Sequence, residues 1–356
     1  METLSPDFAR VEAALNHTEP DRVPVAEVAV DYAIMSQFLG RPVTDDDVAA
    51  QVEFWTQAGY DYSLFTLGMM RPGGVTKDSQ ISKIMAQTLA RDDADEDAWN
   101  LWKKPRIFSE RDFETFPWDR AADYDFSKFE AARAYMPDKM KIIAASGKIF
   151  TLSWMLMGFE NFCVNLKLQP EFTARVIGQV AKIQLDAVRK LADYPGVAAI
   201  WAVDDLAFRS GPIVRLPDLR KFIFPYYEEL AALCHSHGLY LFFHTDGVIW
   251  DLAEDLISLG VDALHPIDPT CMDIDEVKAR LGSRLCLVGN IANDLLAEGT
   301  PDQVAALTRR RLRTIAPGGG YCLGAGNSVP AWARIENYRA MLDTVLREGH
   351  YPINVD

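Results

Sequence analysis

Short runs rich in apolar and β-branched residues alternate with longer amphipathic segments along most of the chain. This alternation predicts βαβ units that build a parallel sheet. Eight runs can be counted, which is the number of strands in a (β/α)8 TIM barrel. The runs are Arg22–Ala29, Tyr60–Thr66, Lys141–Ala145, Val197–Ala202, Tyr240–Phe243, Ala263–His265, Leu285–Val288 and Tyr321–Leu323.

The segments between the runs predict helices that cover the outside of the barrel. Pro6–Asn16 has apolar residues at helical spacing behind Ser5-Pro6, a typical helix start, and predicts an N-terminal helix. Leu216–Cys234 and Pro301–Ile315 repeat the amphipathic pattern between later strands. We therefore expect an α/β protein with one helix between most pairs of strands.

One connection, residues 69–138 before the third strand, is far longer than an ordinary loop. It contains Trp99, Trp102 and Trp118. A length of this kind predicts a functional insertion or lid, and the other interpretation is that the aromatic residues cap one end of the barrel. Because no linker or low-complexity tract interrupts the chain, we expect residues 1–356 to form one barrel domain with this insertion.

Composition and charge narrow the class of protein. The chain of 356 residues is 49% hydrophobic and 24% charged, which is typical of a globular protein with a large core. The formal net charge of −15 disfavours nucleic acid and anionic membranes as partners. We find no apolar run of the roughly 20 residues that a membrane span needs and no secretory signal pattern, so we expect a cytoplasmic protein. The five cysteines contain no C-x-x-C pair and predict reduced, mostly buried thiols.

Polar residues stand where the predicted strands end, and in barrels the reacting groups come from these ends. His244 and Asp246 follow the fifth strand in the motif His-Thr-Asp-Gly. Two residues apart on extended chain, their side chains share one face and could hold a metal or orient an imidazole. The other strand-end residues are Glu27, Asp31, Asp204, Asp205, His265, Asp268, Asn290, Asn327 and Ser328.

Several of these residues also have purely structural interpretations. Asp204 and Asp205 are adjacent and face opposite ways, so we expect at most one of them to touch substrate, and one could simply cap the next helix. His265 is followed by Pro266 and could bond turn backbone instead of a ligand. Trp154 belongs to an apolar stretch that either walls a substrate pocket or packs in the core. Gly318, Gly319 and Gly320 precede a strand and predict a turn.

Motifs spread over nearly the whole chain resemble those of the uroporphyrinogen decarboxylase superfamily, and the resemblance implies a (β/α)8 fold. Two branches of that superfamily are relevant, the porphyrinogen decarboxylases and the methyltransferases that work with corrinoid proteins. The motifs are Arg10–His17 with Glu19–Val25, Gly158–Phe162, Asp204–Leu206, His244–Gly247, Gly260–Leu264, Leu287–Ile291 and Ala316–Tyr321.

The decarboxylase branch carries an arginine-rich segment after the first strand that grips a polycarboxylate substrate. Here that neighbourhood reads Asp-Tyr-Ala-Ile-Met, and no arginine occurs between Arg22 and Arg41. In the methyltransferase branch, the coenzyme M methyltransferases bind zinc through His-x-Cys after the fifth strand and a cysteine in the loop after the eighth. This chain keeps the histidine as His244 but has Asp246 and Asn327 at the two cysteine positions.

The resemblance therefore implies a corrinoid-dependent methyltransferase or demethylase component. It would transfer a methyl group from a small methylated donor, such as a methoxylated aromatic compound, to a corrinoid carried by a partner protein. We expect His244 to stabilise the leaving atom, with zinc or another divalent metal or by acid catalysis, and Asp246 to orient it or serve as a second ligand. Two alternatives stay open, a decarboxylase of a small carboxylated substrate and a ligand-binding barrel without turnover. The expected substrate contacts are Glu27, Asp31, Asp204, Asp205, His265, Asn290, Asn327 and Trp154.

Overall fold

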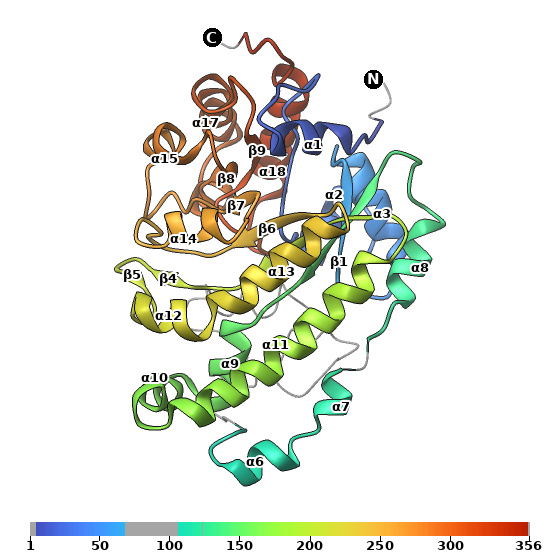
Figure 1. Ribbon diagram of the computed structural model, residues 1–356. Helices are drawn as coiled ribbons and strands as arrows, with labels where there is room; N and C mark the ends of the chain where they lie inside the picture. The colour runs from blue at the N-terminus through green and yellow to red at the C-terminus, as the bar shows by residue number, and fades with distance from the viewer. Residues whose placement is uncertain (1–4, 68–105, 123, 355–356) are drawn as a thin grey trace.

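A curled parallel sheet lies at the centre of the molecule (Figure 1). The computed structural model describes residues 5–67, 106–122 and 124–354. Within these ranges seven strands pair in the order in which they follow one another along the chain, as in a TIM barrel, and they confirm seven of the eight predicted runs. The strands are β1 (Tyr62–Thr66), β2 (Lys141–Ser146), β3 (Val197–Val203), β6 (Tyr240–His244), β7 (Ala263–His265), β8 (Cys286–Ile291) and β9 (Tyr321–Ala325).

The first predicted run occupies the eighth position of the barrel but does not form a continuous strand. It lies beside β9 through single parallel bridges, Val25 with Leu323 and Val30 with Val329. The expectation of an ordinary strand over Arg22–Ala29 is therefore corrected. Pro24 has no N–H to donate to a ladder, although its carbonyl oxygen accepts from Leu323 N at 2.9 Å.

Helices surround the sheet on its outer side (Figure 1). The predicted helix over Leu216–Cys234 is divided at Ile223, and Pro225 opens its second part. The predicted N-terminal helix and the helix that begins at Pro301 are both present. The helices are α1 (Ala9–Leu15), α2 (Tyr32–Leu39), α3 (Val48–Gln57), α6 (Glu110–Thr115), α7 (Trp118–Ala121), α8 (Ser127–Arg133), α9 (Phe150–Met157), α10 (Phe159–Leu168), α11 (Pro170–Ala192), α12 (Leu216–Phe222), α13 (Phe224–Ser236), α14 (Ala253–Ser258), α15 (Ile274–Leu281), α16 (Asn293–Glu298), α17 (Pro301–Thr314) and α18 (Ile335–Glu348).

The predicted insertion 69–138 is described only in its second part, where it forms α6, α7 and α8. Trp99 and Trp102 lie outside the described residues. The Trp118 ring packs on those of Phe113 and Phe116, with ring centroids 5.4 and 4.4 Å apart. Its packing is a local aromatic cluster, and a lid role for this insertion stays a prediction.

The core fills the barrel and the space between sheet and helices. All five cysteines are free thiols, and Cys234, Cys286 and Cys322 are buried, as the sequence predicts.

Gly318, Gly319 and Gly320 form the predicted turn, all with positive φ. Among the helices that the structure describes, none combines the length and the apolar character needed to cross a lipid bilayer.

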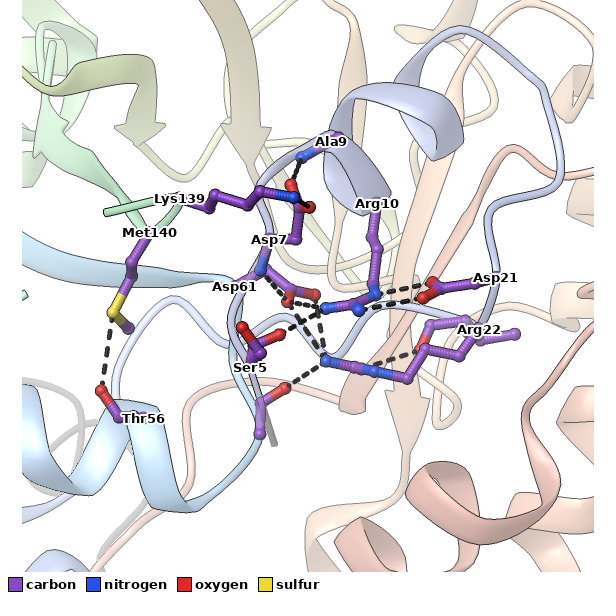
Figure 2. A network of polar contacts seen from close by, with 12 residues as sticks. Ser5, Asp7, Ala9, Arg10, Asp21, Arg22, Thr56, Asp61, Lys139 and Met140 are labelled. Carbon is purple, nitrogen blue, oxygen red and sulfur yellow. Dashed lines mark hydrogen bonds and ion pairs between the residues drawn. The ribbon is translucent and has the colours of Figure 1, made fainter. Parts of the chain in front are cut away.

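A polar network closes the end of the barrel at which the strands begin (Figure 2). The Asp61 carboxylate precedes β1 and is fully buried. It accepts from Arg10 Nη1 at 2.8 Å, from Arg22 Nη2 at 3.2 Å and from Asp7 N at 2.9 Å. Asp21 binds the other edge of the Arg10 guanidinium, at 2.6 and 2.9 Å. The N-terminal motif therefore attaches the first segment of the chain to the barrel.

Candidate functional site

The strand-end motif His-Thr-Asp-Gly forms the centre of a polar cluster at the C-terminal ends of β3 and β6. His244 is the last residue of β6, and its Nε2 lies 3.6 Å from Asp205 Oδ1 and 3.9 Å from Asp246 Oδ1. The ligand atoms of these three residues all lie within 4.8 Å of one another. The imidazole is buried at 2% exposure, whereas the Asp205 and Asp246 side chains are 42% and 37% exposed. The cluster thus has a buried nitrogen and two carboxylates that solvent can reach.

The other two residues of the motif hold the loop in place. Thr245 Oγ1 accepts a hydrogen bond from Leu206 N at 2.8 Å, and Thr245 N donates to the His265 carbonyl oxygen at 3.0 Å. Gly247 has φ +89°, and a Cβ on it would lie 2.5 Å from the carbonyl oxygen of Phe208. Only glycine fits where the loop meets this backbone.

Phe208 belongs to a small hairpin that follows β3, formed by β4 (Ala207–Phe208) and β5 (Gly211–Pro212). Val248 N donates to the Phe208 carbonyl oxygen at 2.9 Å, so the hairpin packs directly on the loop after β6. This hairpin was not predicted from the sequence. Each strand has only two residues, which is too short to give an alternating pattern.

His265 supports His244 from the neighbouring strand β7. The two Nδ1 atoms lie 2.7 Å apart, and the Trp201 ring meets His265 nearly at right angles at 5.2 Å. The pKa of His244 is lowered to about 4, chiefly by burial; the charge of Asp205 opposes this effect and the charge of Lys148 adds to it. Burial also places the pKa of His265 well below its ordinary value. Both imidazoles are therefore neutral near neutral pH.

Asn327 connects the loop after β9 to the cluster. Its Nδ2 donates to both oxygens of Asp246, at 3.0 and 2.8 Å, and its Oδ1 accepts from Ser328 N at 2.6 Å. Burial raises the pKa of Asp246 well above its ordinary value, and the charges of Asp205 and Asp268 raise it further, while Asn327 lowers it. The amide therefore orients Asp246 and partly stabilises its anion.

Asp204 has a different function from its neighbour Asp205. Its buried carboxylate lies at the N-terminus of α9, where it accepts from the backbone N–H groups of Ile149, Phe150 and Thr151 at 2.6 to 2.8 Å. The Tyr227 hydroxyl donates to the same carboxylate. These bonds occupy its oxygens in fixing a helix end. Of the two adjacent aspartates, Asp205 is the one that faces His244.

Three of the remaining expected contacts have hydrogen-bond partners outside the three-residue cluster. Asp31 caps α2 by accepting from Ala33 N at 2.8 Å, Asn290 donates to the Ile267 carbonyl oxygen at 2.9 Å, and Glu27 Oε1 accepts from Ala325 N at 2.7 Å. In the part of the chain that the structure describes, none of the three makes a hydrogen bond to the cluster. Trp154 is buried on α9, with its ring edge-on to Phe159 at 5.5 Å.

One charged residue near the cluster was missed. Lys148 follows β2 and is 8% exposed, and its charge lowers the pKa of both His244 and Asp204. It stands three residues beyond the predicted run that ends at Ala145. The sequence did indicate it, because Lys148 follows a predicted strand, and the residues that follow barrel strands form the site.

Comparisons with known proteins agree with this architecture. The family described as Uroporphyrinogen decarboxylase (URO-D) matches residues 104–347. A protein named uroporphyrinogen decarboxylase from Azoarcus sp. (strain BH72) is 34% identical over 103 residues, which are 29% of this chain and 27% of that protein. A solved structure described as a methyltransferase from Methanosarcina mazei aligns over 97% of this chain and 98% of its own, with a TM-score of 0.66 and 14% identity. The last likeness demonstrates a shared fold along nearly the whole chain.

Proposed function

We propose that this chain, which belongs to the uroporphyrinogen decarboxylase family, is a methyltransferase component. It would move a methyl group from a small methylated donor to a corrinoid protein. Two features support methyl transfer over decarboxylation of a porphyrinogen. The segment between Arg22 and Arg41 has no arginine that could hold a polycarboxylate. The cluster itself presents the carboxylates of Asp205 and Asp246, which repel such a substrate.

The observation that carries the proposal is the convergence of Asp205, His244 and Asp246 within 4.8 Å. One imidazole nitrogen and two carboxylate groups suit a hard or borderline divalent cation, zinc included. Asp246 occupies one of the positions that a cysteine takes in the zinc-binding relatives. Asn327 occupies the other. Its Oδ1, the atom with which an amide would bind a metal, accepts from Ser328 N, and its Nδ2 donates to Asp246, so it orients a ligand instead of acting as one.

The chemistry needed is cleavage of the bond between a methyl carbon and an oxygen or nitrogen of the donor. The electron pair of that bond stays on the heteroatom, which develops negative charge or basicity. A cation bound at the cluster would supply Lewis-acid stabilisation of this atom. The corrinoid of the partner protein would supply the nucleophile that accepts the methyl group. Exposure of Asp205 and Asp246 at the mouth leaves one side of the site open to both reactants.

The residues of this chain have separate tasks in the proposal. His244 provides the buried nitrogen ligand, and Asp205 and Asp246 provide oxygen ligands. Asn327 holds Asp246, as the two hydrogen bonds to its carboxylate support. Asp204 holds the start of α9, and through that helix it would position Trp154 as a wall of the donor pocket.

Metal analysis and a transfer assay test the proposal together. Purified protein is stripped with chelator, reloaded with Zn²⁺, Mn²⁺ or Co²⁺, and assayed anaerobically for methyl transfer from methoxylated aromatics and methylamines to free cob(I)alamin. We expect one cation per chain in the wild type, with loss of cation and transfer in His244→Ala and Asp205→Asn. The control is His235→Ala, whose Nε2 contacts Asp262 at the far end of the barrel. Metal content and transfer that persist in His244→Ala would rule out the proposed site.

A second candidate is decarboxylation of a small carboxylated substrate, favoured by the 103-residue match to a protein named uroporphyrinogen decarboxylase. Release of carbon dioxide without methyl transfer would select it. A donor that binds and is recovered unchanged would instead select a ligand-binding barrel.

A further inference from the structure

The contact between His244 and His265 places two like atoms together. Their Nδ1 atoms lie 2.7 Å apart, and the ring centroids are separated by 4.9 Å. Each Nδ1 can be a donor when it carries a proton or an acceptor when it does not. At this distance one must carry the proton and the other must present its lone pair. The two rings therefore have linked tautomers.

Two arrangements satisfy this contact. In the first, His265 Nδ1–H donates to His244 Nδ1, and the proton of the neutral His244 ring sits on Nε2. That N–H then faces Asp205 Oδ1 and Asp246 Oδ1, at 3.6 and 3.9 Å. In the second, His244 Nδ1–H donates to His265 Nδ1, and His244 Nε2 presents a lone pair toward the same carboxylates.

The presence or absence of a cation at the cluster decides which of the two arrangements is favoured. With no cation, a lone pair facing two carboxylate oxygens is repelled, whereas an N–H is attracted, so the first arrangement is favoured. A cation needs the Nε2 lone pair as a ligand, so only the second arrangement can bind it. His265 must then accept from His244 and carry its own proton on Nε2.

We infer that His265 is a positioning residue that couples cation binding at Asp205, His244 and Asp246 to a switch of tautomer in both histidines. The inference rests on the cation site of the proposed function. The proton balance is closed. One proton leaves His244 Nε2 for solvent, a second moves from His265 Nδ1 to His244 Nδ1, and solvent returns one to His265 Nε2. No net charge is gained or lost in the pair.

The surroundings of His265 Nε2 explain why the switch would depend on the cation. His265 Nε2 is buried and has no hydrogen-bond partner among the residues that the structure describes. A proton placed there is unsatisfied, which disfavours the second arrangement until a cation compensates. His265 therefore keeps His244 protonated on Nε2 in the empty site and supports it as a ligand in the filled one.

The first test reads the tautomers directly. The chain has six histidines, so ¹⁵N-histidine labelling gives a small set of ring signals that substitutions at positions 244 and 265 assign. Without cation, we expect His244 protonated on Nε2 and His265 on Nδ1. Saturation with Zn²⁺, which is diamagnetic, should exchange both assignments. A His244 tautomer that stays the same through saturation would overturn the inference.

The second test measures Zn²⁺ affinity by calorimetry in chelator-stripped protein. His265→Leu removes the acceptor for His244 Nδ1–H and should weaken Zn²⁺ binding about 10- to 100-fold, as is typical for the partner of a ligating histidine. His265→Asn places an amide oxygen near the position of Nδ1 and should restore most of the affinity. Circular dichroism checks that both variants fold, and His237→Leu at the end of α13 is a control that should bind as the wild type.

The outcomes separate the inference from the function on which it rests. Wild-type protein that binds no Zn²⁺ overturns the cation site and the inference together. Binding that is equal in wild type, His265→Leu and His265→Asn overturns the inference alone. Tautomer exchange with weakened binding in His265→Leu supports the inference even if no methyl transfer is found.

Discussion

The hydroxyl of Tyr62 accepts a hydrogen bond from the backbone N–H of Glu27 at 2.7 Å and donates one to the carbonyl oxygen of the same residue at 2.8 Å. Both backbone groups are buried. A neighbouring strand would normally supply these two bonds, but in the described ranges the bridges of the first segment go to His350, Leu323 and Val329, and none goes to β1. One tyrosine side chain thus satisfies the backbone where the ladder is interrupted.

Tyr62→Phe removes only one oxygen atom but should destabilise the fold strongly. It leaves a buried donor and a buried acceptor unpaired, and each costs about 1–3 kcal/mol, so we expect the free energy of unfolding to fall by about 2–6 kcal/mol in urea titration. The control is Tyr240→Phe, whose hydroxyl accepts from Asn16 at 3.0 Å in an exposed contact. Equal effects in the two variants would argue against the bridging role.

The buried carboxyl group of Glu27 should make the free energy of unfolding depend on pH. Full burial raises its pKa well above the ordinary value of 4.5. Below that ordinary value both folded and unfolded chains hold the proton, and the stabilising effect is complete. As pH rises, the unfolded chain releases the proton first, so stability is lost until the folded pKa is passed.

Glu27→Gln removes this titration while keeping the size and the acceptor for Ala325 N. The variant should gain on the wild type as pH rises from about 5 to about 8, by up to about 1.4 kcal/mol per pH unit. Urea midpoints at several pH values measure the difference. A constant difference across this range would mean that the folded pKa is not raised.

Gly247→Ala should distort the loop that carries His244 and Asp246. The new Cβ would meet the Phe208 carbonyl oxygen at 2.5 Å, in addition to the strain of φ +89°. Gly40→Ala is a matched control, because Gly40 has φ +70° but nothing within 4 Å of an added Cβ. We expect a loss of about 1 kcal/mol for Gly40→Ala from backbone strain alone, and a larger loss for Gly247→Ala together with weaker Zn²⁺ binding. Similar stability and unchanged Zn²⁺ affinity in both variants would contradict the packing of the hairpin on this loop.

Asp61→Asn tests the network at the other end of the barrel. The substitution leaves the guanidinium groups of Arg10 and Arg22 without their shared buried anion, and removal of one partner from a buried ion pair typically destabilises by about 3–5 kcal/mol. Asp21 also binds Arg10 but is 61% exposed, so Asp21→Asn should lower the unfolding free energy by less than about 1 kcal/mol. Chemical denaturation of the two variants compares them, and a small effect of Asp61→Asn would contradict the buried anchor.

Local pattern was enough to predict most of the barrel. Seven of the eight apolar runs are strands of the parallel sheet, because buried parallel strands are continuous apolar runs that end at polar residues. The same logic placed His244 and Asp246 at the end of β6. The exception was the first run, where Pro24 cannot donate to a ladder and the Tyr62 hydroxyl supplies two hydrogen bonds to the Glu27 backbone.

The missed features depend on contacts between residues far apart in the chain. Asp204 and Asp205 are adjacent in sequence, yet one binds backbone about 54 residues away at the start of α9 while the other faces His244. Asn327 reaches Asp246 across 81 residues. Spacing alone contains no information about such partners, since they are set by how the strands close into the barrel. The sequence could state that one of the two aspartates was structural, but not which one.

The anchor of Arg10, Arg22 and Asp61 lies where the strands begin, and the cluster around His244 lies where they end. The N-terminal motif therefore maintains architecture, at a distance from the cluster around His244. A substitution at position 246 can change the chemistry of the cluster without disturbing that anchor. Likeness at the N-terminal motif therefore reports on the fold, and the reaction has to be determined from the residues at the strand ends.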